Sequence, residues 1–264
     1  MAKAIKKVYI HTDLEGVSGI DLGETLQNDH PKHRHCVERL MADVNAAVDG
    51  AFAGGAEHVT VLDSHGGGGN FDLDLLDKRA ENDFKVNGKW WGKLDGSYDA
   101  TFFIGAHAMA GTMSGFHDHT QSGVAIHNYY LNGRKAGELA QWAIVCAHYS
   151  VPLVMASGDE AAMLEAVQFF GDIELAAVKR GITRAVARLV PCNTAVGLIR
   201  EAAKAAVEKT APVYCFAPRL PMEVKIEFNR ADYCEDCIRS DPKMERIDAR
   251  TAAKITDSYQ DFWY

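Results

Sequence analysis

Short apolar runs alternate with helix-like repeats along most of the chain. Four runs are predicted to be buried strands, because β-branched and aromatic residues gather in them: residues 7–13, 58–62, 101–104 and 151–155. Between 33 and 53 the apolar residues recur at helical spacing, and a pair of glycines ends that helix. A strand, a helix and a second strand in this order favour parallel pairing with a right-handed crossover.

The rest of the chain predicts further helices and two more strands. Helices are expected at residues 137–149, 159–169, 182–189, 194–210 and 251–262, and strands at 123–131 and 224–228. Strands that alternate with helices predict an α/β fold with a mainly parallel sheet and flanking helices. After a unit of residues 1–190, a smaller C-terminal α+β portion is expected over 191–264, with one compact unit as the alternative.

Composition and charge narrow the class of protein. The 264 residues include 28 Lys and Arg against 36 Asp and Glu, which gives a net charge of −8. This acidic balance argues against a nucleic-acid partner, because such proteins need a basic face. The longest apolar stretches fall far short of the ~20 residues that cross a bilayer, and no secretion signal follows the first lysines. We therefore expect a cytoplasmic globular protein with no membrane or nucleic-acid partner.

The six cysteines agree with a reducing compartment. Most of them stand alone within apolar or helical patterns, and a chain of this length needs no disulfide to hold its core. Only Cys234 and Cys237 have the spacing of a metal-ligand or redox pair. A structural zinc site of that type needs a second pair, which the sequence lacks, so this motif is weak evidence for a function.

Polar residues directly follow three of the predicted strands. Asp13 and Glu15 come after the first strand, His65 after the second and His107 after the third. Because the carboxyl ends of parallel strands line the ligand crevice of an open α/β sheet, these side chains are expected to converge. Histidines and carboxylates are the usual ligands of catalytic zinc, and a carboxylate that bridges two ions suits a dinuclear site.

Each of these residues also has a purely structural interpretation. An aspartate or histidine after a strand often only shapes a turn or caps a helix. Glu138 begins a predicted helix, where the helix dipole alone favours an acidic residue. On an extended segment His117 and His119 would point to the same side, as two metal ligands or as acid–base or oxyanion-stabilising groups. The glycines at 66–69 lack the lysine of a P-loop.

The sequence His-Thr-Asp-Leu-Glu-Gly-Val-Ser-Gly from residue 11 to 19 resembles the Ser-x-Asp-x-Glu-Gly signature of a known family. The family is that of the zinc-dependent D-aminopeptidases of the bacterial dipeptide-transport operon type. Further similar blocks follow in the same order: Asp63-Ser-His65, Phe103–Ala108, His119-Thr120, Asn132 with Gly137-Glu138, Gly158-Asp159 and Val178–Arg184. The similarity extends to about residue 200, and several blocks in one order are far more specific than any single block.

The resemblance implies a centre with two Zn²⁺ per subunit. In the family the first aspartate of the signature bridges both ions, and the matching residue here is Asp13. Glu15 and His65 would complete one zinc site, and His107 and Glu138 would complete the other. The resemblance thus gives Glu138 a role that its position at a helix start does not reveal.

The resemblance further implies a catalytic histidine and an assembly. His119 matches the catalytic residue better than His117, because the family has Thr or Ser after this histidine. Members assemble as decamers of two stacked pentamers, so a homo-oligomer, possibly a homodecamer, is implied. The chain departs from the family at His11, which replaces the leading Ser, and in a slightly longer segment near residues 113–127. Asp63 and Asp118 are the nearest candidates to orient the ligand histidines.

The implied activity is release of the N-terminal residue, a D-amino acid, from short peptides or amino acid amides. A hydroxide on the metals would attack the carbonyl, while His119 moves a proton or stabilises the oxyanion. A metal-dependent amidase or lactam hydrolase for a non-peptide substrate would need the same centre. A non-catalytic metal- or peptide-binding protein is a further alternative. A nucleotide-binding domain is disfavoured, because no Gly-x-Gly-x-x-Gly motif follows the first strand.

Overall fold

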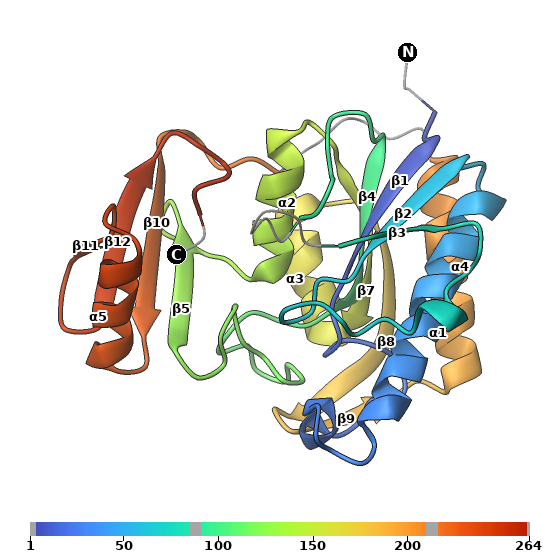
Figure 1. The fold of residues 1–264 in the computed structure, drawn as a ribbon, viewed down its shortest axis with the longest axis horizontal. Helices are drawn as coiled ribbons and strands as arrows, with labels where there is room; N and C mark the ends of the chain where they lie inside the picture. The colour runs from blue at the N-terminus through green and yellow to red at the C-terminus, as the bar shows by residue number, and fades with distance from the viewer. Residues whose placement is uncertain (1–3, 85–90, 210–215, 263–264) are drawn as a thin grey trace.

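A seven-stranded sheet forms the centre of the computed structural model, which describes residues 4–84, 91–209 and 216–262 (Figure 1). Its strands lie in the order β3 (Glu81–Asp83), β2 (His58–Leu62), β1 (Lys7–Thr12), β4 (Ala100–Ala106), β7 (Leu153–Asp159), β8 (Glu174–Thr183) and β9 (Val186–Leu189). All neighbours are parallel except β9, which runs antiparallel to β8. The four strands predicted from apolar runs are β1, β2, β4 and β7, which lie side by side in this sheet.

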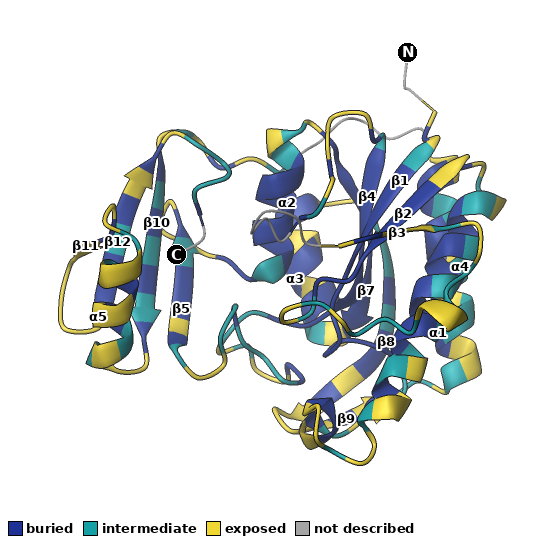
Figure 2. Ribbon diagram, viewed as in Figure 1, coloured by how far each residue is buried: buried dark blue, intermediate teal, exposed yellow. Residues whose placement is uncertain are grey.

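Helices cover both faces of the seven-stranded sheet (Figure 1). α1 (His33–Ala53) and α4 (Cys192–Glu208) pack together on one face, and α2 (Glu138–His148) and α3 (Glu160–Phe170) lie on the other. The central strands β1, β2, β4 and β7 between these layers are almost entirely buried (Figure 2). This arrangement confirms the predicted α/β fold. Within the described residues, no helix combines the length and the apolar character needed to cross a membrane.

A second, antiparallel sheet lies beside α2 and α3 (Figure 1). Its strands follow the order β11 (Glu245–Arg246), β12 (Thr251–Thr256), β10 (Met222–Phe228), β5 (Ile126–Leu131) and β6 (Arg134–Lys135). α5 (Ala231–Ser240) packs on β10 and β12. The division into one domain of residues 1–190 and a smaller one of residues 191–264 stays a prediction. In the structure α4, which follows residue 190, packs against α1, and β5, which precedes it, pairs with β10.

Two predicted helices are wrong. Residues 182–189 form the end of β8 and the whole of β9, which pair as a hairpin. Residues 251–262 contain β12, which pairs with β10 along its full length, and no helix follows it among the described residues. Both segments are short apolar stretches whose neighbours in space offer backbone hydrogen bonds, and this pairing decides their structure.

The sequence pattern did not indicate α5, which carries the two closely spaced cysteines. Cys234 and Cys237 are fully buried and unpaired, and they pack with the apolar side chains of the second sheet. Burial raises the pKa of Cys237 to about 12, so its thiol is not a reactive thiolate at neutral pH. The structure therefore supports a packing role for this pair.

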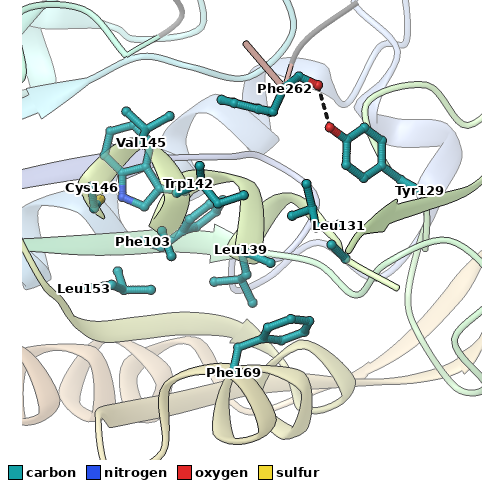
Figure 3. Close-up of a cluster of buried hydrophobic side chains, with 14 of the residues drawn as sticks. Phe103, Tyr129, Leu131, Leu139, Trp142, Val145, Cys146, Leu153, Phe169 and Phe262 are labelled. Carbon is teal, nitrogen blue, oxygen red and sulfur yellow. Dashed lines mark hydrogen bonds between the residues drawn. The ribbon is translucent and has the colours of Figure 1, made fainter. Parts of the chain in front are cut away.

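A hydrophobic cluster joins α2 to both sheets (Figure 3). Leu139 and Trp142 of α2 pack near Phe103 of β4 and are fully buried. In the second sheet the hydroxyl of Tyr129 donates a hydrogen bond to the carbonyl of Phe262. Phe262 is itself buried, so this part of the C-terminal aromatic tail is packing, while residues 263–264 lie outside the described residues. The cluster fixes α2, whose first turn reaches the predicted metal centre.

Candidate metal centre

Three neighbouring strands end at the same edge of the larger sheet and carry the predicted ligands. β1 pairs in parallel with β2 on one side and with β4 on the other. Asp13 follows β1, His65 lies shortly after β2, and His107 directly follows β4. Glu138 is the first residue of α2, whose N-terminus points to the same place. The topology thus brings together residues that are far apart in the sequence, as the strand-end argument predicts.

The ends of β1 and β4 approach each other so closely that one position requires glycine. Gly105 has a φ of +83°, and a Cβ there would lie 2.1 Å from the backbone oxygen of Asp13. The amide of Asp13 in turn donates to the carbonyl of Ile104 at 2.8 Å. These contacts fix the backbone of Asp13 beside that of His107.

Asp13, Glu15 and His65 form one group that could hold a metal ion. The Nδ1 atom of His65 lies 2.9 Å from Oδ1 of Asp13 and 3.1 Å from Oε2 of Glu15. Both carboxylates are buried. The ligand atoms of the three residues expected for one zinc site therefore lie close enough together for a single ion to contact all of them.

Asp13 also belongs to a second group, with His107 and Glu138. The Nε2 atom of His107 lies 3.3 Å from Oδ2 of Asp13 and 3.5 Å from Oε1 of Glu138. The two oxygens of Asp13 thus face different histidines, as is expected of a carboxylate that would bridge two ions. On its other side, Nδ1 of His107 lies 3.0 Å from the carbonyl of Ala108, which only accepts hydrogen bonds. Donation by Nδ1 leaves the Nε2 lone pair available for a metal.

His119 lies at the same centre, whereas His117 does not. Nε2 of His119 is 3.7 Å from Glu138 and 3.9 Å from Glu15, and its ring stacks on that of His107 at 4.1 Å. Together with Glu15 and His107 it forms a third possible metal-binding group. The segment is not extended, because His117 has a φ of +52°, so the two rings do not point to the same side and lie at 83° to each other.

Several buried atoms of the centre lack the hydrogen bonds that such atoms normally make. Apart from the contacts within the centre, Oδ2 of Asp13, Oε2 of Glu15 and Nε2 of His107 have no hydrogen-bond partner among the described residues. The carboxylates of Asp13, Glu15 and Glu138 also lie close together, which is unfavourable unless cations compensate their charge. Divalent ions would satisfy the atoms and balance the charge, and a donor set of imidazoles and carboxylates suits zinc.

The carboxylates make the histidines of the centre unusually basic. Burial alone would lower the pKa of His65, but the nearby Glu15 and Asp13 outweigh burial and raise it to about 11. For His107, Glu138 and Asp13 likewise outweigh burial and hold the pKa well above its ordinary value. Conversely, burial would raise the pKa of Glu138, but the charges of His107 and His119 outweigh burial and lower it to about 2.

Zinc binding to metal-free protein is therefore expected to release protons at neutral pH. His65 and His107 are protonated below their raised pKa values, and a ligand nitrogen must lose its proton, so roughly two protons leave per subunit. Because protons compete with zinc, the affinity rises with pH. Calorimetric titration in buffers of different ionisation enthalpy counts these protons. Zinc uptake without proton release contradicts the two histidines as ligands.

A buried lysine on β8 supports the loop that follows β1. Lys179 is 2% exposed, and its ammonium donates to the carbonyls of Glu15 and Ile20, at 2.8 Å each. Burial lowers the pKa of Lys179 to about 7, although Asp43 and Asp159 oppose this effect. No role for Lys179 is predicted from the sequence. The one available signal was the similarity of the block Val178–Arg184 to the family.

Replacing this lysine is expected to destabilise the protein. Lys179→Met keeps most of the side-chain volume but leaves two buried carbonyls without a donor, at about 1–3 kcal/mol for each. We expect a lower urea midpoint and weaker zinc retention, because the loop that carries Glu15 loosens. Urea unfolding and zinc content measure the two effects. An unchanged midpoint with full zinc content contradicts this supporting role.

Asp63 and Asp118 do not orient the ligand histidines. Asp63 accepts hydrogen bonds from the amides of Asn70 and Phe71 and so orders the glycine-rich loop. Asp118 accepts from the amide of Gly111 at 2.7 Å. The expectation based on their closeness in sequence was wrong, because backbone amides within each loop are nearer partners than the imidazole rings.

Two cavities meet at Glu15 and His65. The inner cavity has a volume of about 210 Å³ and is lined by His11, Thr12, Asp13, Glu15, Ser64, His65, Gly66, His119, Gln121, Glu138 and Gln141. The outer cavity has a volume of about 390 Å³ and is lined by Glu15, Leu26, Gln27, Asn28, Asp29, His65 and His117. The candidate metal centre thus opens on two sides, and the inner side is the smaller.

A parallel sheet whose carboxyl end carries two histidine–carboxylate groups around one aspartate is typical of metal-dependent hydrolases. The model of a family described as D-aminopeptidase matches residues 6–264. The chain belongs to this D-aminopeptidase family, because the match covers nearly all of it. The family suggested by the ordered sequence blocks is confirmed.

Two comparisons with individual proteins agree with the family match. The chain is 28% identical over 225 residues to the D-aminopeptidase of Bacillus subtilis (strain 168). This alignment covers 84% of the present chain and 81% of the Bacillus protein. The fold of the chain matches the solved structure of the Zn-dependent D-aminopeptidase DppA from Bacillus subtilis, described as a self-compartmentalizing protease, with a TM-score of 0.90. That match has 25% sequence identity and covers 97% of this chain and 93% of the other.

Proposed function

We propose that this protein is a zinc-dependent aminopeptidase that releases N-terminal D-amino acids from short peptides or amino acid amides. The observation that carries the proposal is the position of Asp13, whose two oxygens face His65 and His107. This supports two zinc ions per subunit, with Glu15 completing one site and Glu138 the other. The zinc dependence of the similar Bacillus protein agrees with this donor set.

The residues around the centre would divide the chemistry between them. Bound zinc would lower the pKa of a coordinated water and polarise the substrate carbonyl. Nδ1 of His119 lies 2.8 Å from the carbonyl of His117, so it donates there, and Nε2 is left to face the inner cavity. His119 would accept a proton from the attacking water and deliver it to the leaving amine. The backbone amide of Gln121 holds the carboxylate of Glu138 at 2.6 Å.

The alternatives differ in the substrate or in the absence of turnover. An amidase or lactam hydrolase would use the same centre on a non-peptide substrate. A non-catalytic metal- or peptide-binding protein would need no proton-transfer group. The position of Nε2 of His119, 3.7–3.9 Å from two carboxylates of the centre and on the wall of the inner cavity, favours an enzyme over a binding protein.

We also propose that the subunits form a homo-oligomer, specifically a homodecamer, and that the protein acts in the cytoplasm. The support for an assembly is the description of the similar Bacillus protein as self-compartmentalizing. On α3, Leu164 and Val167 are 62% and 50% exposed and lie one turn apart, which offers apolar area for an interface. Light scattering on the purified protein tests the number of subunits.

The proposed function predicts that the zinc-loaded protein hydrolyses D-alaninamide and short peptides with an N-terminal D-alanine. The N-acetylated forms are expected to resist, because an aminopeptidase needs the free amine. Chromatographic detection of released amino acids measures this. Turnover of a lactam without turnover of aminoacyl amides would favour the amidase, and zinc binding without any turnover would favour the binding protein.

A further inference from the structure

The inner cavity contains a pair of glutamines whose amide groups are incompletely bonded. Nε2 of Gln121 donates to Oε1 of Gln141 at 3.0 Å. The remaining Oε1 of Gln121 and Nε2 of Gln141 are buried and have no hydrogen-bond partner in the part of the chain that the structure describes. If both amides are rotated by 180°, the roles exchange, and one carbonyl and one NH₂ group still remain unpaired. Because buried polar groups normally find partners, the pair points to a ligand that supplies both.

The glutamine pair adjoins one side of the metal centre. Gln141 is completely buried and lies one turn along α2 from Glu138, so both side chains project from the same face of the helix. The backbone of Gln121 donates to the carboxylate of Glu138. A ligand that bonds to this pair would therefore lie beside the group of Asp13, His107 and Glu138.

His11 forms a rigid wall of the same cavity. It is 3% exposed, its ring stacks on Trp142 at 4.2 Å, and it meets the ring of Phe103 edge-on at 4.5 Å. A side chain packed in this way cannot swing aside to enlarge the cavity. The volume of about 210 Å³ lies below the ~300–1,000 Å³ that is typical of pockets for drug-sized ligands. The space left beside the metal centre suits only a small side chain.

We propose that the inner cavity binds the N-terminal residue of the substrate. The unpaired carbonyl of the glutamine pair accepts a hydrogen bond from the substrate ammonium, and His11 restricts the side chain to about the size of alanine. An N-terminal residue carries both complementary groups, an ammonium that donates and a carbonyl that accepts. The rest of the peptide then lies in the larger outer cavity, which shares Glu15 and His65 with the inner one. This inference rests on the proposed function for the direction of the peptide.

Binding of two small carboxylates to the zinc-loaded protein tests the ammonium contact without requiring turnover. D-Alanine and propionate differ only in the amine, so the ratio of their dissociation constants in calorimetry reports recognition of the ammonium. Gln121→Met removes the carbonyl that is unpaired in the structure, and it is expected to reduce this ratio about tenfold or more, as for loss of a hydrogen bond to a charged group, with zinc content unchanged. Gln141→Met removes the carbonyl to which Gln121 donates, so it should shift the ratio in the same direction and serves as the second variant if Gln121→Met does not fold.

Gln168→Met, on the exposed side of α3, serves as the matched control and should leave the ratio unchanged. A ratio that is unaffected in both cavity variants overturns the contact and indicates that the amine binds elsewhere, such as on zinc. If the variants lose the ratio but the wild-type protein hydrolyses no aminoacyl amide, the proposed function fails while the amino-acid subsite stands.

The wall is tested separately by His11→Ser, which restores the residue of the signature that the chain resembles. The variant should bind D-leucine at least about tenfold better relative to D-alanine than the wild-type protein does, because room for extra methylene groups is gained. Zinc content should not change, since His11 belongs to none of the three possible metal-binding groups in the described residues. An unchanged preference overturns the size restriction.

Discussion

Asp13→Ala is expected to abolish both zinc retention and turnover. Asp13 belongs both to the group with Glu15 and His65 and to the group with His107 and Glu138. One of its oxygens faces His65 and the other faces His107, so its loss weakens both metal sites together. Without the metals no water is activated near neutral pH, and we expect kcat/KM for D-alaninamide to fall by more than about a thousandfold. Metal analysis by mass spectrometry and the rate of D-alanine release measure the two losses.

The exposed Asp172 supplies the matched control for this change. Its side chain is 95% exposed, so Asp172→Ala should leave zinc content and activity unchanged. Circular dichroism establishes that the Asp13 variant remains folded. If a folded Asp13→Ala protein retains two zinc ions and full activity, the aspartate does not bridge the ions and the proposed centre is wrong.

His119→Ala is expected to lose turnover while it keeps zinc. In the proposed mechanism this histidine moves a proton rather than holding an ion, and general acid–base catalysis contributes about 10²–10⁴-fold to a rate. We expect a fall of that size in kcat for D-alaninamide with little change in zinc content. Steady-state kinetics and metal analysis of the same protein sample separate these effects.

Two further histidine variants show whether the effect is specific to His119. His127→Ala removes an exposed imidazole from β5 and should change neither property. His117→Ala removes a side chain that lines the outer cavity but leaves in place the carbonyl to which His119 donates. Loss of zinc in His119→Ala would make His119 a ligand, in agreement with its group with Glu15 and His107. Loss of turnover in His117→Ala alone would transfer the catalytic role to His117.

Much of the candidate centre could be predicted from the sequence, because sheet topology converts strand ends into neighbours. Asp13, Glu15, His65 and His107 all follow predicted parallel strands, and the structure brings them together. Glu138 depended on the resemblance, because an acidic residue at a helix start has an equally good structural explanation. Its role as a ligand, like that of the other four, stays a prediction.

The residues that support the centre could not be predicted, because their roles depend on contacts between distant parts of the chain. Lys179 reaches a carbonyl 164 positions away, and nothing near it in the sequence indicates that contact. The pairing of Gln121 with Gln141 likewise exists only after α2 packs beside the preceding loop. Burial and unmet hydrogen bonds identify such residues, and both are properties of the folded chain.

For the fold, too, elements set by a local sequence pattern could be predicted, whereas elements set by pairing with distant strands could not. The long repeat from 33 to 53 became α1, since a sustained helical period is hard to satisfy otherwise. Residues 182–189 and 251–256 became strands instead of helices, because β8 and β10 supply hydrogen-bonding partners that short apolar runs do not reveal. Periodicity was therefore reliable for the long helices and misled only at these two segments, where strand pairing decides the structure.

The zinc content of the purified protein is the most direct measure of whether its activity depends on a two-zinc centre. The protein is freed of metal with a chelator, reloaded with zinc, dialysed and analysed for metal, and its hydrolysis of D-alaninamide is followed at each step. Two zinc ions per subunit, with activity that is lost on chelation and returns on reloading, is the predicted result. A protein that retains no zinc, or that hydrolyses the amide equally well without metal, is not a zinc-dependent aminopeptidase.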